Sequence, residues 1–207
     1  MDKIKILLRP VYKKFKSILC ILQRTIFSCF YDLKIPIKKN INIAENVKFY
    51  RGSRVIYYSG VMEVGSNTEI CCYSKIILGG GNLKIGKNCL LGEYGIYNVF
   101  ANLIIGNDVM TADRVSFVNN IHQYVDINTP IKRQPTTNDS IVIGDGTWIG
   151  MNATILAGTN IGNNCVVAAH SVVKGDFPNY CVIAGVPGKI IKKYNFNKKM
   201  WEKSTNV

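Results

Sequence analysis

The 207-residue sequence has little histidine, no CxxC cysteine pair and no long uninterrupted apolar run. The two histidines, His122 and His170, are too few for a three-histidine zinc site, and the cysteine spacing indicates neither a structural zinc site nor a redox motif. We therefore expect no bound metal. Seven scattered cysteines are typical of a reducing cytoplasm. The apolar run at Ile18 is broken by Gln23 and Arg24, too early for a secretory signal or a membrane-spanning helix.

Acidic residues are also scarce, with 13 Asp and Glu against 26 Lys and Arg. The excess is confined to the ends: residues 1–39 carry a net charge of +8, residues 189–207 carry +5, and residues 40–188 are formally neutral. A nucleic-acid-binding body would carry a basic stripe of its own, so no nucleic-acid partner is expected. Basic ends on a neutral body fit a membrane surface or a polyphosphate ligand, or are simply solvated.

What the sequence does contain is a six-residue repeat. An aliphatic residue, often followed by Gly, recurs at Ile143, Ile149, Ile155, Ile161, Val167 and Val173. Upstream the same position recurs at Ile43, Val64, Ile85 and Ile105, at intervals of one 18-residue coil plus two or three inserted residues. This period fits neither an amphipathic helix nor simple strand alternation. With Gly, Asn and Asp in the turns, it predicts an all-β solenoid, a left-handed parallel β-helix of hexapeptide repeats.

Three segments depart from the repeat. Residues 119–140 have lost the six-residue phase and are predicted to be a loop extruded from the β-helix domain of residues 40–188. Residues 11–33, within the basic segment 1–39, have helical apolar spacing; this amphipathic helix would either lie on an anionic membrane or pack on the open end of the solenoid. The basic tail, residues 189–207, is predicted to form a C-terminal cap.

Three motifs then carry a family resemblance: the His-containing loop from Asn119 to Asp126, the stretch Ile143–Gly150 with Trp148 at its centre, and Ala184–Pro187 followed by basic residues. With these motifs the chain resembles the hexapeptide-repeat acyltransferases. It most resembles bacterial O-acetyltransferases of polysaccharide and O-antigen synthesis, with maltose, galactoside and xenobiotic acetyltransferases as wider relatives. The resemblance implies acetyl-CoA as donor, a homotrimer with sites between protomers, and a carbohydrate or lipid-linked glycan acceptor.

The resemblance also implies roles for single residues. His122 would be the general base that takes the proton of a sugar hydroxyl, since imidazole titrates near neutral pH. Asp126 either orients this imidazole or stabilises the loop. Cofactor-binding positions would be Trp148 in the wall of the site, Met151 and Ala169 along the acyl–pantetheine arm, and Lys174, Lys189 and Lys192 at the distal end; Asn119 and Asn120 would meet the acceptor.

Other functions remain open or are disfavoured. An N-acetyltransferase of a nucleotide-linked amino sugar would look similar in sequence, and a non-catalytic, membrane-associated scaffold could keep the solenoid alone. Zinc carbonic anhydrases of this fold need three histidines. Nucleotidyltransferases and serine acetyltransferases carry larger N-terminal domains than the sixty residues that precede the clear repeats. We expect a cytoplasmic enzyme, and the sequence leaves open a peripheral contact at the inner membrane face.

Overall fold

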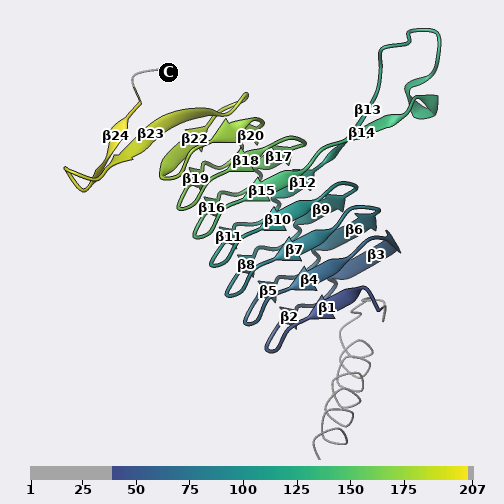
Figure 1. Ribbon diagram of the computed structural model, residues 1–207, viewed down its shortest axis with the longest axis horizontal. Helices are drawn as coiled ribbons and strands as arrows, with labels where there is room; N and C mark the ends of the chain where they lie inside the picture. Colours follow the sequence, from purple (N-terminus) through teal and green to yellow (C-terminus); the bar gives the residue numbers. More distant parts are fainter. Residues whose placement is uncertain (1–38, 205–207) are drawn as a thin grey trace, which may run out of the picture.

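A computed structural model describes residues 39–204 and shows a parallel β-solenoid (Figure 1). Each coil except the last contributes one short strand to each of three sheets. In the first coil these strands are β1 (Ile41–Ile43), β2 (Lys48–Phe49) and β3 (Arg54–Ser59). Every strand pairs in parallel with its equivalent in the next coil, so each sheet runs along the column. The fold class predicted from the six-residue period is confirmed.

The sheets differ in their length along the column. The first sheet contains β1, β4 (Met62–Val64), β7 (Leu83–Ile85), β10 (Leu103–Ile105), β15 (Ile141–Ile143), β18 (Asn160–Ile161) and β21 (Asp176–Phe177). The second sheet contains β2, β5 (Glu69–Ile70), β8 (Leu90–Leu91), β11 (Met110–Thr111), β16 (Trp148–Ile149), β19 (Val166–Val167), β22 (Cys181–Ala184), β23 (Lys189–Asn195) and β24 (Met200–Lys203). The third sheet contains β3, β6 (Lys75–Gly79), β9 (Ile96–Val99), β12 (Ser116–Val118), β17 (Thr154–Leu156) and β20 (Val172–Val173).

The phased aliphatic residues form the interior of the column. Ile85, Ile105 and Ile143 lie in register on neighbouring strands of the first sheet, and all three are buried. The extra residues of the upstream coils all fall between a strand of the third sheet and the next strand of the first. The spacing from the first to the second sheet, and from the second to the third, stays constant from coil to coil. Inserted residues therefore leave the core register undisturbed.

The corner between the first and second sheets shows why Gly and Asn recur in the repeat. A positive φ recurs there in one residue of each of four successive coils: Asn46, Asn67, Asn88 and Asp108. Each of these Asn side chains donates a hydrogen bond to the equivalent residue of the next coil. Asn and Asp tolerate this conformation at lower cost than other residues with a Cβ. Beside them lies a column of glycines, where a Cβ on Gly86 would lie 2.4 Å from the carbonyl oxygen of Gly106. Side chains are thus excluded at this point by the next coil.

The two ends of the column differ. After β22 the chain turns back, and β23 pairs antiparallel with β22 and with β24. The predicted C-terminal cap is therefore a hairpin that extends the second sheet only. The helix expected over residues 11–33 lies outside the described residues. Within residues 39–204, no helix is long and apolar enough to cross a bilayer.

Replacement of Gly86 by Ala tests the close stacking of the coils. The added methyl group would overlap the main chain at Gly106, so we expect a loss of about 1–3 kcal/mol in the free energy of unfolding. Thermal unfolding followed by circular dichroism measures the effect. Lys84→Ala, an exposed position on the same coil, serves as the control. Equal melting temperatures for the two variants would contradict the stacking described here.

Candidate active site

The segment that leaves the solenoid is a β-hairpin with an ordered tip (Figure 1). β13 (Asn120–His122) and β14 (Thr136–Asn138) pair antiparallel, with His122 opposite Thr136, and a single 3-10 turn, η1 (Ile131–Arg133), lies between them. The hairpin follows β12 and returns to β15, so it emerges from the corner between the third and first sheets. His122 ends β13 and is exposed. The loop predicted over residues 119–140 is thus present, with its histidine presented to solvent.

A buried glutamine holds the tip of this hairpin in shape. The Gln134 Nε2 donates hydrogen bonds of 2.8 Å to the carbonyl oxygens of Asp126 and Thr129, and its Oε1 accepts one of 3.3 Å from the Asp126 backbone amide. A side chain that binds three backbone groups across the loop removes much of its freedom. The strand that carries His122 therefore pairs with β14 along its length, and the chain just beyond it is held by Gln134.

Asp126 serves the same loop. Its carboxylate accepts hydrogen bonds from the Asn128 backbone amide at 2.9 Å and from the Thr129 hydroxyl at 2.6 Å. These two hydrogen bonds hold the pKa of Asp126 below its usual value, and the bond from Thr129 has the larger effect. An Asp side chain that accepts from the backbone amide two residues on forms a common local turn. Of the two roles left open by the sequence, the single chain favours loop stabilisation over orientation of His122.

The two asparagines at the base of the hairpin have different surroundings. Asn119 is 0% exposed; its Nδ2 donates to the Ala101 carbonyl and its Oδ1 accepts from the Phe100 amide, both at 2.9 Å. In the single chain these polar atoms secure the main chain of the preceding coil, and a contact of Asn119 with the acceptor stays a prediction. Asn120 points the other way, is half-buried, and has an Oδ1 with no hydrogen-bond partner among the described residues.

The positions carried over for the cofactor lie on the C-terminal coils. Trp148 is exposed on the outer face of the second sheet, while Met151 and Ala169 are exposed at the corner that follows, on adjacent coils. Lys192 pairs with Val182 at the end of the same sheet. The remaining two are also exposed, Lys174 just after β20 and Lys189 at the start of β23. Within residues 39–204 of one chain, no hydrogen bond or ion pair connects any of these side chains with His122.

Sequence reasoning missed two exposed apolar surfaces. Leu90, Met110 and Trp148 lie in register on neighbouring strands and form a row on the outer face of the second sheet; we call this the apolar row. On the hairpin tip, Val125 is 85% exposed and Ile127 is 93% exposed. Strand alternation predicts the first surface, because each row residue precedes an inward-pointing one. The exposed hairpin tip depends on the geometry of the loop, and no sequence pattern predicts it.

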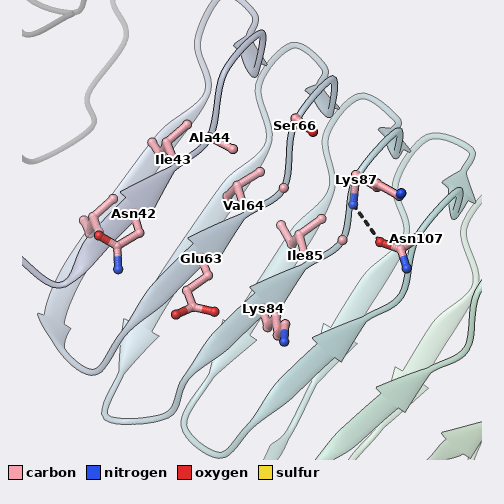
Figure 2. A pocket seen from close by; sticks show the side chains of 13 residues that line it. Asn42, Ile43, Ala44, Glu63, Val64, Ser66, Lys84, Ile85, Lys87 and Asn107 are labelled. Atoms are coloured by element: carbon pink, nitrogen blue, oxygen red, sulfur yellow. Dashed lines mark hydrogen bonds between the residues drawn. The ribbon is translucent and has the colours of Figure 1, made fainter. Parts of the chain in front are cut away.

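A cavity of about 770 Å³ lies elsewhere, on the first coils. Figure 2 shows Asn42, Glu63 and Lys84 on the outer face of the first sheet, and Lys87 and Asn107 at the corner, where the Lys87 amide donates to the Asn107 Oδ1 at 3.1 Å. It is shallow and polar at its rim, and none of the predicted site residues lines it. This hollow among residues 39–204 therefore lies away from the residues predicted to carry the chemistry.

The expected absence of a metal remains a prediction, and among the described residues no cluster of three or more His, Cys, Asp or Glu side chains could hold one. A parallel solenoid of hexapeptide coils, with a histidine on an extruded hairpin, is the architecture of a class of acyl-transferring enzymes. Residues 140–175 match the family described as bacterial transferase hexapeptide (six repeats). The chain belongs to the hexapeptide-repeat acyltransferase family.

Relatives support this assignment. The chain is 35% identical over 170 residues to the protein named lipopolysaccharide biosynthesis O-acetyl transferase WbbJ of Escherichia coli, covering 75% of this chain and 87% of WbbJ. It is 34% identical over 143 residues to the protein named acetyltransferase Rv3034c of Mycobacterium tuberculosis, covering 69% of this chain but 47% of that longer protein. The chain thus spans about half the length of this second relative.

A solved structure supports the fold. The N-acyltransferase AntD of Bacillus cereus, in complex with dTDP and 3-hydroxybutyryl-CoA, superposes with a TM-score of 0.63 at 17% identity, covering 77% of this chain and 86% of AntD. At this identity the likeness concerns the fold alone.

Replacement of Asn119 by Ala separates a structural role from acceptor binding. The change leaves the Phe100 amide and the Ala101 carbonyl without their partner, so we expect a loss of about 2–3 kcal/mol in the free energy of unfolding. Thr137→Ala, on the exposed hairpin strand, is the control in the same thermal melts. A variant that melts like the wild type but shows weaker acceptor binding would contradict the structural role and support acceptor binding by Asn119.

Proposed function

We propose that the protein is an acetyl-CoA-dependent O-acetyltransferase that acts on a sugar hydroxyl of a surface polysaccharide or its precursor. The observation that carries the proposal is the exposed imidazole of His122 on a hairpin braced by Gln134. A base presented in this way can meet a large acceptor that would not enter an enclosed cavity. The similarity to WbbJ, which is named as a lipopolysaccharide O-acetyl transferase, favours this acceptor class.

The reaction needs one base and one set of oxyanion donors. The neutral imidazole of His122 takes the hydroxyl proton as the sugar oxygen forms its bond to the thioester carbonyl carbon. Backbone N–H groups stabilise the oxyanion of the tetrahedral intermediate. The carbon–sulfur bond then breaks, and the departing thiolate takes the proton from the imidazolium. The products are the acetyl ester and free coenzyme A, with His122 neutral again.

The donor would lie along the C-terminal coils. Exposed backbone and side chains at Met151 and Ala169 offer contacts to an extended pantetheine arm. Lys174, Lys189 and Lys192 supply point charges for phosphates rather than the bidentate contacts that Arg would make. The structure of AntD with 3-hydroxybutyryl-CoA supports a CoA thioester as donor. A CoA-dependent enzyme with free cysteines suits the cytoplasm.

A trimer would bring these parts together. His122 belongs to the hairpin that emerges from the corner between the third and first sheets, whereas Trp148 lies on the second sheet of the same column. Exposed side chains such as Val125 and Ile127 on the tip could bury their surface against the apolar row of a neighbouring copy. That contact would place His122 of one copy beside Trp148 of the next, completing a site between protomers.

A second candidate is N-acylation of a nucleotide-linked amino sugar. The observation in its favour is the shared fold with AntD, a named N-acyltransferase whose complex contains dTDP. The two functions differ in the bond formed. Mild alkaline hydroxylamine removes an O-acetyl ester but leaves an N-acetyl amide, so treatment of the labelled product distinguishes them.

The test is turnover of radiolabelled acetyl-CoA with a panel of neutral glycans, lipid-linked glycans and nucleotide amino sugars. We expect transfer to a hydroxyl acceptor and a fall of about 10²- to 10⁴-fold in His122→Ala, the range for a general base. His170→Asn is the matched control, because Asn tolerates the positive φ of this position. Equal activities of wild type and His122→Ala would contradict the assigned base, and an alkali-stable product would favour the second candidate.

A further inference from the structure

The C-terminal hairpin extends the second sheet beyond the last coil of the column (Figure 1). β23 and β24 form its two strands, with Tyr194 opposite Trp201 and Lys192 opposite Lys203. Residues 196–199 connect them at the tip. β24 is the last strand of the second sheet, and the hairpin adds no strand to the other two sheets, so it adds no further coil to the core. A role in the core therefore does not explain the side chains of this hairpin.

Aromatic side chains cluster along this hairpin. The Phe196 ring lies edge-on to Tyr180 and Tyr194, with centroids 4.9 and 5.1 Å apart, and Tyr194 meets Trp201 at 5.4 Å. Although these rings support one another, Phe196 remains 61% exposed and Met200 remains 52% exposed. Large apolar side chains gathered at a protruding tip are costly to leave in water and mark a contact surface.

The same hairpin is strongly basic. Its one acidic residue, Glu202, is bound by Lys198 at 2.7 Å and raises the pKa of that lysine chiefly through this hydrogen bond. Because residues 40–188 are formally neutral, the positive charge of the described chain is concentrated at this end. The lysines of the hairpin are Lys189, Lys192, Lys193, Lys198, Lys199 and Lys203.

We propose that this hairpin is a docking surface for an anionic lipid membrane. Phe196 and Met200 would bury apolar surface in the interfacial region, where the Trp201 ring is also favoured because its indole has a polar edge. Lys193, Lys199 and Lys203, which have no assigned role at the donor site, would meet lipid phosphates. The charge complements an anionic surface, whereas the identical hairpin of a second copy carries the same charge and would be repelled. A soluble polyphosphate would need the lysines but would gain nothing from an exposed Phe and Met.

This inference goes beyond the proposed acetyl transfer and does not require it. Docking at this end would set the column with its last coils toward the bilayer and its first coils away from it (Figure 1). A lipid-linked acceptor would then be presented near the coils that carry Trp148 and Met151. Lipid binding is measured without donor or acceptor, so its failure would leave the catalytic proposal intact.

The experiment uses the full chain with vesicles of phosphatidylcholine alone or with one-third phosphatidylglycerol. We expect co-sedimentation with the anionic vesicles and a fall of about thirtyfold in partitioning for Lys199→Gln with Lys203→Gln. Phe196→Ser with Met200→Ser should also weaken binding. The control is Tyr58→Ser with Lys84→Gln, which removes an exposed aromatic and a lysine from the first coils.

A second measurement reports how deeply Trp201 enters the bilayer. The chain has two tryptophans, so Trp148→Phe leaves Trp201 as the only one. Lipids brominated on the acyl chain should quench Trp201 fluorescence in the anionic vesicles. An unquenched Trp201 overturns the proposal, as do hairpin variants that partition like the Tyr58 and Lys84 control. Displacement by soluble polyphosphate without any Trp201 quenching would assign the lysines to a soluble polyanion and also overturn it.

Discussion

The stacking of each coil on the next is the constraint on which the rest of the structure depends. Main-chain hydrogen bonds join equivalent strands of neighbouring coils, and inward side chains such as Ile105 and Ile143 lie in register. The register tolerates no side chain where Gly86 faces Gly106, and it uses Asn and Asp where the backbone turns left-handed. Every coil is thereby fixed by its neighbours, and an insertion is accepted only where it leaves the core. That place is the corner between the third and first sheets, from which the His122 hairpin emerges.

A stiff column with one permitted site of insertion explains how a loop can hold a reactive group in place. The hairpin is anchored at its base by β12 and β15 and at its tip by Gln134. Asn119 secures the coil beneath it. Asp126 closes a local turn at the tip. The residues around His122 are thus mostly structural, and they leave the imidazole itself exposed.

Much of this could be predicted from the sequence, for a physical reason. The six-residue phase at Ile143, Ile149 and Ile155 reports the core directly, and the loss of phase marks the extruded loop. Strand alternation from the inward-pointing Phe117 also predicts that Asn119 points inward, whereas the resemblance to the family implied a contact with the acceptor. The hydrogen bonds of Asp126 depend on the path of the loop, which no periodicity encodes. In the proposed trimer the exposed tip would meet the apolar row of a neighbouring copy, and a single chain does not contain that contact.

The proposed mechanism requires that His122 of one copy and Trp148 of the next meet over the donor thioester. Mixed assemblies test this requirement: His122→Ala and Trp148→Ala chains, each expected to be inactive alone, are unfolded, combined and refolded together. We expect turnover of acetyl-CoA to reappear in the mixture, because some interfaces then pair an intact His122 with an intact Trp148 of the next copy. Mixed assemblies that form but stay inactive at every ratio would contradict it.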